Sequence, residues 1–326
     1  MPISVQVIIL QSVYVRLVAV LDTQPSFGKN RPVRIPFNSL KNVEKRHAGH
    51  VILPVVQSSE PSLHQLLELA MAAAREAGAL LLDYARTGFH VAHKSPINLV
   101  TDADHAAEQC VIDRIRSVYP SHGFLAEECG RIEHGPSPYR WIIDPLDGTT
   151  NFAHGYPTYC VSIGLEHRGR CVLGVVYDPS RDELFTALNG TGARLNGNPI
   201  HVSREDSLEH SLLVTGFAYD IRETARNNLD HFGRFALNAQ GVRRTGSAAL
   251  DLCYVAAGRF DGFWEVRLNP WDMAAGTVLV REAGGRLTNF RGDDLSIYGQ
   301  ELVATNGLIH GAMLEVLREG ETPTPA

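Results

Sequence analysis

The chain has 326 residues, of which 44% are hydrophobic and 20% are charged. This composition is typical of a globular protein and excludes disordered, collagen-like and coiled-coil chains, and the length suffices for one large domain or two ordinary ones. Its 30 Lys and Arg and 36 Asp and Glu leave a net charge of −6, so we expect no nucleic-acid partner and favour a small or metal-bridged substrate.

The cysteine and histidine content argues against disulfides and zinc. The five cysteines are an odd number without a C-x-x-C pair, which predicts neither a disulfide framework nor a zinc ribbon and favours the reducing cytoplasm. The 14 histidines follow no metal-ligand spacing such as H-E-x-x-H. We therefore expect a cytoplasmic protein without a histidine metal site.

The first sixty residues differ from the rest of the chain. The apolar stretch 5–21 is short and is interrupted by polar residues, among them Arg16; an arginine at mid-bilayer costs about 2.5–3.5 kcal/mol, so no membrane span is predicted. Residues 29–46 are rich in Lys and Arg, which leaves organelle targeting open. The expected organisation has three parts: residues 1–61 as a poorly ordered or mis-assigned extension, residues 62–318 as the folded domain and residues 319–326 as a disordered tail.

Helical periodicity begins at Ser62, a candidate N-cap, and Leu and Ala residues then recur at steps of three and four as far as Ala77. A second helix is predicted over Asp104–Tyr119, closed by Pro120. Three strands are predicted further along, at residues 141–143, 161–165 and 171–177.

The C-terminal half continues the alternation of strands and helices. The pair Asn196-Gly197 predicts a hairpin turn. A long helix is predicted over Asp272–Ala283, with Asp272 as its N-cap and Gly284-Gly285 at its end. Helices that alternate with strands predict an α/β body of stacked layers.

The motif WIIDPLDGTTNF at residues 141–152 concentrates the chemistry. Pro145 favours an extended conformation for Asp144, whose carboxylate then projects from the end of a short strand. Asp147 begins a turn into residues typical of a helix start, so the backbone N–H groups of residues 148–150 are expected to converge on an anion such as phosphate.

Two carboxylates so close together require a cation. Like charges about 4 Å apart cost roughly 1 kcal/mol even in water, and no Lys or Arg lies between Asp144 and Phe152. Mg²⁺ with oxygen ligands resolves this repulsion, although an ordinary Asp-rich turn also explains the motif. Other acids stand at strand or helix ends, where capping is an equally simple reason for each of them: Glu127, Glu128, Asp102, Asp104 and Asp272.

Together these segments resemble a known family. WIIDPLDGTTNF and NPWDMAAGTVLVREAGG are similar to the two signature motifs of the inositol monophosphatase family, within the Mg²⁺-dependent, lithium-sensitive phosphatases. The resemblance runs from Leu63 to Leu317 and includes three further segments: AEE at 126–128, VTDAD at 100–104 and GSAALDLCYVAAGRFDGFWE at 246–265.

The resemblance implies a five-layer αβαβα fold, a homodimer and a hydrolase that cleaves phosphate monoesters with two to three Mg²⁺ ions. It assigns the first ion to Glu127, Asp144 and the carbonyl of Leu146, and the second ion to Asp144, Asp147 and Asp272. It assigns a weaker third ion to Asp104. It assigns catalysis to Glu127, Thr149 and Asp144, and substrate binding to Gly148, Thr149, Gly246, Ser247, Ala248 and Glu265.

These roles imply a mechanism without a phosphoenzyme. Glu127 and the Thr149 hydroxyl would orient and deprotonate a water whose pKa a metal ion lowers, and the second ion would stabilise the leaving oxygen. Two positions depart from the family pattern. Lys94 lies one residue closer to its motif than in the animal enzymes, and Gly155 replaces a common basic residue near the dimer contact or substrate rim.

The substrate expected from the resemblance is inositol 1-phosphate. Histidinol phosphate, fructose 1,6-bisphosphate, NADP and nucleotide 3'-phosphates are substrates of related folds and stay open. Glu265 suits a polyol hydroxyl or an ammonium group, and Arg243 and Arg244 would meet a second phosphate or pair with surface acids. A non-catalytic relative is expected to lack at least one of the acids, whereas all of them are present.

Overall fold

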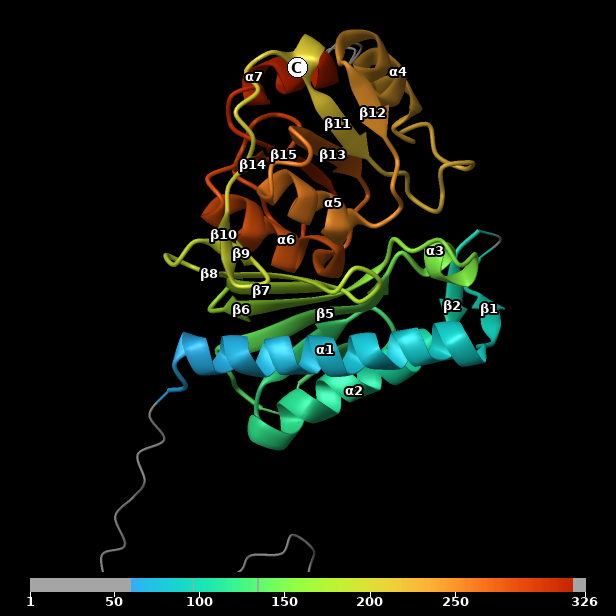
Figure 1. Cartoon of the computed structure of the whole chain (residues 1–326), viewed down its shortest axis with the longest axis vertical. Helices are drawn as coiled ribbons and strands as arrows, with labels where there is room; N and C mark the ends of the chain where they lie inside the picture. Colours follow the sequence, from blue (N-terminus) through green and yellow to red (C-terminus); the bar gives the residue numbers. More distant parts are fainter. Residues whose placement is uncertain (1–59, 96, 134, 319–326) are drawn as a thin grey trace, which may run out of the picture. The chain divides into compact units, whose positions relative to one another are not determined.

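The computed structural model describes residues 60–95, 97–133 and 135–318 (Figure 1). Residues 1–59 of the extension predicted over residues 1–61, and the tail predicted over residues 319–326, lie outside these residues. Helix α1 (Leu63–Thr87) begins where the sequence predicts, because Ser62 and Gln65 form a reciprocal capping box. None of the helices in these ranges is long and apolar enough to cross a membrane.

The first two layers are a helix pair and a large sheet. Helices α1 and α2 (Asp102–Val118) pack on one face of an eight-stranded sheet ordered β10-β9-β8-β7-β6-β5-β3-β4 (Figure 1). Its strands are β3 (Gly123–Ala126), β4 (Gly130–Ile132), β5 (Tyr139–Asp147), β6 (Cys160–His167), β7 (Arg170–Asp178), β8 (Glu183–Leu188), β9 (Ala193–Leu195) and β10 (Asn198–Ile200). A small hairpin, β1 (Val91–His93) with β2 (Leu99–Thr101), joins α1 to α2.

The remaining layers follow on the other face of this sheet. Helices α5 (Ala248–Ala256) and α6 (Pro270–Glu282) separate it from a five-stranded sheet ordered β12-β11-β13-β15-β14, and α4 (Leu229–Asn238) and α7 (His310–Arg318) cover the far face of that second sheet (Figure 1). Its strands are β11 (Leu212–Thr215), β12 (Gly241–Arg243), β13 (Gly262–Val266), β14 (Arg286–Thr288) and β15 (Glu301–Thr305). The predicted αβαβα order is confirmed.

Strand β5 shows why the sequence of the large sheet is continuously apolar. Trp141 and Ile143 pack toward α1 and α2, whereas Ile142 between them packs toward α5 and α6, and all three are fully buried. A strand buried on both faces cannot alternate apolar with polar residues.

Two glycines let α6 lie directly on the large sheet. A Cβ atom on Gly164 of β6 would lie 2.6 Å from the Cβ of Ala274, and one on Gly174 of β7 would lie 2.3 Å from the carbonyl oxygen of Ala275. The absence of side chains at both positions therefore sets the height of α6 above the strands. The same contact places the first turn of α6, which carries Asp272, over the sheet that carries Asp144.

Most of the predicted local elements are confirmed, with shifts at their ends. Helix α2 begins at Asp102, because Thr101 is its N-cap. Asn196 and Gly197 form the β9–β10 turn with positive φ angles of 48° and 81°. All five cysteines are free thiols, as predicted.

The prediction that Asp272 is the N-cap of its helix is wrong. Helix α6 begins at Pro270 with Asn269 as N-cap, since proline is well suited to the first helical position. Asp272 is the third helical residue, and its Oδ2 accepts the N–H of Asn269 at 2.7 Å. The strand end predicted at Ile143 is also too early, because β5 continues to Asp147.

The close packing of α6 gives a direct test. Gly174→Ala should lower the free energy of unfolding by about 1–3 kcal/mol, because the new methyl group meets the backbone of α6. Gly233→Ala in α4 is the matched control: no atom lies within 4 Å of its Cβ position, and it should gain about 0.5–1 kcal/mol in helix stability. Equilibrium urea denaturation measures both, and equal stabilities of the two variants would contradict the packing argument.

Candidate active site

Four carboxylates approach one another at the end of β5. Strands β3 and β5 are parallel neighbours, with Ala126 opposite Ile143, so Glu127 leaves β3 beside Asp144, and its N–H donates to the Ile143 carbonyl at 3.2 Å. The ladder between β5 and β6 shifts register between Asp144 and Asp147, where Pro145 has no N–H to donate. This irregular strand end carries both aspartates.

Burial and mutual repulsion make these carboxylates costly to ionise. Burial raises the pKa of Asp144 well above its usual value, and the negative charges of Glu127, Asp147 and Asp272 raise it further. Burial also raises the pKa of Asp272 well above its usual value, with the charge of Asp147 next. Burial raises the pKa of Glu127 to about 7, although the charge of Lys94 opposes the shift. The four groups therefore form one electrostatic unit.

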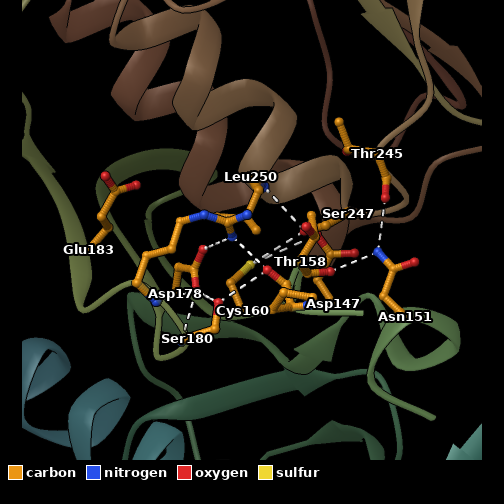
Figure 2. Close-up of polar contacts among 12 residues, drawn as sticks. Asp147, Asn151, Thr158, Cys160, Asp178, Ser180, Glu183, Thr245, Ser247 and Leu250 are labelled. Atoms are coloured by element: carbon orange, nitrogen blue, oxygen red, sulfur yellow. Dashed lines mark hydrogen bonds and ion pairs between the residues drawn. The ribbon is translucent and has the colours of Figure 1, made fainter. Parts of the chain in front are cut away.

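Asp147 is held by the start of α5 (Figure 2). Its Oδ2 accepts the Ser247 hydroxyl and the Ala249 N–H, both at 2.7 Å. Ser247 is one of the residues predicted to line the alcohol side of the pocket, and its hydroxyl orients Asp147. Nearby, the Asn151 amide donates to the carbonyls of Thr158 and Thr245, at 2.7 and 2.9 Å, and so ties α3 (Thr149–Ala153) to the segment before α5.

Hydrogen bonds orient each of the three aspartates. Oδ1 of Asp144 accepts the Leu146 N–H at 3.0 Å, and Oδ2 of Asp272 is occupied by its capping bond. The Ala248 N–H and the Asn269 side chain also stabilise the charged forms of Asp147 and Asp272, whereas Oδ2 of Asp144 accepts no hydrogen bond in residues 60–95, 97–133 and 135–318. In those same residues no three acidic, His or Cys side chains converge closely enough to ligate a common ion. The donor chemistry, hard carboxylate oxygens under mutual repulsion, fits Mg²⁺.

The hydroxyl of Thr149 forms a hydrogen bond with the carboxylate of Asp104, which lies in the first turn of α2. The Thr149 hydroxyl lies 3.0 Å from Oδ1 of Asp104 and 3.0 Å from the carbonyl oxygen of Leu146. Oδ2 of Asp104 accepts the N–H and the hydroxyl of Thr101, at 2.7 and 2.6 Å. Burial raises the pKa of Asp104, and the hydrogen bonds from the two threonines oppose the shift. Within the described residues Thr149 has no hydrogen bond to Glu127, so its observed partner is Asp104.

Lys94 supplies a cation beside the first acid. Its Nζ lies 3.1 Å from Oε1 of Glu127 and 2.5 Å from Oε1 of Glu128. The altered spacing of Lys94 in the sequence therefore still places its charge next to the acids. Gly155, the other departure, has a φ of 68°, and a side chain there would be strained.

The predicted phosphate-binding turn begins at Gly148. This residue is the N-cap of α3 with a φ of 100°, and a Cβ atom on it would lie 2.8 Å from the Thr158 carbonyl oxygen. Only glycine fits both constraints. The first N–H groups of α3 have no acceptor within the helix, as the prediction for residues 148–150 requires.

Glu265, which the sequence predicts as a substrate-binding residue, is a buried residue of β13. It is 7% exposed, and a Cβ atom on Gly216 would lie 2.3 Å from its Oε2. Burial raises the pKa of Glu265 well above its usual value, followed by the charges of Asp272, Asp251 and Asp147, while Arg244 lowers it. Gly246, with a φ of 94°, brings its backbone to within contact of the Arg244 guanidinium.

Sequence reasoning missed Tyr219. The phenol is 45% exposed, yet burial of its hydroxyl raises its pKa, and the charges of Glu127, Asp147, Asp144 and Asp272 raise it further. It belongs to the segment between β11 and α4, which Asp220 ties to Arg267 after β13 at 2.8 Å. No motif surrounds Tyr219, so only the fold associates it with the acids.

The chain is similar in sequence and structure to known proteins. The profile of the inositol monophosphatase family matches residues 62–321. An inositol-1-monophosphatase from Synechocystis sp. is 47% identical over 265 residues, covering 81% of this chain and 92% of that protein. Nus factor SuhB of Escherichia coli is 44% identical over 259 residues, covering 79% and 97%. The solved inositol monophosphatase of Anabaena (Nostoc) sp. has a TM-score of 0.73 at 46% identity, covering 79% and 97%.

The chain therefore belongs to the inositol monophosphatase family. Members of this family are phosphatases that hydrolyse phosphate monoesters, and the chain is a phosphoric monoester hydrolase of that kind.

Because the acids repel one another, removing the charge of one of them should raise the stability of the protein and abolish its activity. Without metal, Asp144→Asn should raise the melting temperature, by about 2–4 °C for each kcal/mol of repulsion removed, while phosphatase activity is lost. Asp178→Asn is the control. Asp178 is equally buried but lies 2.7 Å from Arg181, so its removal should destabilise the fold. Thermal melts in a chelator measure both, and a lower melting temperature for Asp144→Asn would contradict the repulsion.

Proposed function

We propose that this phosphatase is Mg²⁺-dependent, that it acts on inositol 1-phosphate in the cytoplasm as a homodimer, and that it uses two to three ions. The observation that carries the proposal is the joint presence, at the end of β5, of the four repelling carboxylates and the Thr149–Asp104 pair. Metal ions would supply the positive charge that the carboxylates lack, and the phosphate ester would supply further oxygen ligands to those ions.

Six residues would hold the ions. Glu127, Asp144 and the Leu146 carbonyl would bind the first, Asp144, Asp147 and Asp272 the second, and Asp104 a third. When bound, Mg²⁺ supplies Lewis acidity that lowers the pKa of a water and neutralises the charge on a leaving oxygen. Oδ2 of Asp144, which has no hydrogen-bond partner among the described residues, supports this assignment.

Thr149 and Asp104 would move the proton of the attacking water. The Thr149 hydroxyl has one hydrogen, which it donates to Asp104 or to the Leu146 carbonyl, so its lone pairs remain available to accept a hydrogen bond from water. Burial raises the pKa of Asp104, which suits it to receive that proton when no third ion is bound to it. The backbone N–H groups of residues 148–150 would hold the phosphate oxygens in line.

The polyol substrate is supported by Glu265 and by a named relative. Within the described residues, Glu265 has no hydrogen-bond partner although it is buried, and a carboxylate in that position would accept hydrogen bonds from ring hydroxyls. The Synechocystis relative is an inositol-1-monophosphatase.

A second candidate substrate class is favoured by Arg244. Its side chain is exposed at the edge of the site, next to Gly246, and no carboxylate in the described part of the chain pairs with it. A free guanidinium there suits a substrate with a second phosphate, such as fructose 1,6-bisphosphate.

A panel of phosphate monoesters tests the proposal. Phosphate release should be highest with inositol 1-phosphate, should require Mg²⁺ and should stop in a chelator. A preference for fructose 1,6-bisphosphate that Arg244→Gln abolishes would replace the first substrate by the second. The absence of Mg²⁺-dependent release from every ester would reject the catalytic proposal and favour a non-catalytic role.

The proton path predicts a large effect of one hydroxyl. Thr149→Ala should lower kcat about 100-fold or more, because it removes a group that acts in the transition state. Thr277→Ala is a matched control: its hydroxyl donates to a backbone carbonyl, that of Ala274, at 3.1 Å in α6, and kcat should be retained. Steady-state kinetics at saturating Mg²⁺ provide the measurement, and equal kcat values for the two variants would move the role away from Thr149.

A further inference from the structure

A buried glutamate in α2 binds the backbone directly behind Glu127. Glu108 is 4% exposed, and its two carboxylate oxygens accept two consecutive N–H groups, those of Glu128 and Cys129, each at 2.9 Å. No Lys or Arg of the described residues forms an ion pair with it. A buried carboxylate without a counter-ion is stable only when hydrogen bonds satisfy it, so these two bonds are the reason that the charge is tolerated.

These bonds help to hold residues 127–129, which follow β3, in place. The N–H of Glu127 donates to β5, and the next two N–H groups donate to α2. Three consecutive backbone groups are thus anchored on two different elements. The Glu127 side chain leaves this anchored segment toward the acids, with Lys94 on its Oε1.

The same helix also carries Asp104. Asp104 and Glu108 are four residues apart, so their side chains lie on one face of α2, about 5–6 Å apart at Cβ. Asp104 contacts Thr149, whereas Glu108 contacts the backbone after Glu127. Two side chains one helical turn apart therefore connect α2 to Thr149 and to the segment of Glu127.

We infer that Glu108 is a positioning residue that sets the Mg²⁺ affinity of the site at Glu127 by fixing the backbone behind that ligand. This inference rests on the proposed function. Partners that orient a metal ligand commonly change metal affinity by about 10–100-fold when they are lost. A glutamine at this position has one acceptor oxygen and one NH₂ group, so it keeps one of the two bonds and opposes a donor to the other N–H.

The chain offers a closely matched control. Glu282 in α6 accepts the N–H groups of Gly190 and Gly192 with its two carboxylate oxygens, at 2.9 and 2.8 Å. It lies ten residues after Asp272 in the same helix, which is about 15 Å along the axis. Glu282→Gln therefore removes the same kind of contact from the backbone of a turn outside the site.

The experiment compares Glu108→Gln, Glu282→Gln and the unmutated protein in two assays. The first is the Mg²⁺ concentration that gives half-maximal phosphate release, and the second is the rise in melting temperature that Mg²⁺ causes in the absence of substrate. We expect Glu108→Gln to need at least about 10-fold more Mg²⁺ in both assays and to keep a turnover near normal at saturating Mg²⁺. Glu282→Gln should lose melting temperature without a change in either Mg²⁺ response.

The outcomes separate the inference from the proposed function. Equal Mg²⁺ responses of the two variants would overturn the role of Glu108 and leave the phosphatase intact. An unmutated protein whose activity and melting temperature ignore Mg²⁺ would overturn both. If Glu108→Gln does not fold, Glu108→Asp takes its place, because it keeps the charge but is one methylene too short to reach both N–H groups, and an unchanged Mg²⁺ requirement of that variant would reject the inference.

Discussion

The repulsion among four buried carboxylates at the end of β5 is the constraint on which the site depends. Buried negative charges separate unless rigid elements hold them, and here β3, β5 and α6 do so. The large sheet fixes Glu127 beside Asp144 through backbone pairing, and the glycines under α6 let the helix that carries Asp272 approach the same strands. Packing energy in three apolar cores supports a cluster that costs stability by itself.

Hydrogen bonds to the three aspartates offset part of this cost. Asp144 is held by its own turn, Asp147 by the start of α5 and Asp272 by the cap of α6. These donors orient the carboxylates, and Oδ2 of Asp144 is left without a partner among the described residues. The proposed ions would bind these carboxylates, so that binding would recover part of the stability that the cluster costs.

Helix α2 connects the two halves of the chemistry. Its first turn ends in Asp104, which contacts Thr149 of α3, and its next turn ends in Glu108, which contacts the segment of Glu127. The large sheet alone would leave both segments as free loops at its edge. The buried face of α2 thus does more than cover the sheet, because it also carries side chains that order the site.

Local signals in the sequence determined the elements that have local causes: the capping box at Ser62, the turn at Asn196-Gly197, and the acids of the two motifs. They could not determine which partner each side chain meets, because the hydrogen bonds of Thr149 to Asp104 and of Ser247 to Asp147 span 45 and 100 residues of chain. For the same reason the local pattern places Asp272 at the N-cap of its helix, where the structure has Asn269, and no local signal marks Tyr219 or Glu108. The sequence by itself determines the residue types and the local secondary structure. The distance between one charged side chain and another depends on how the layers pack.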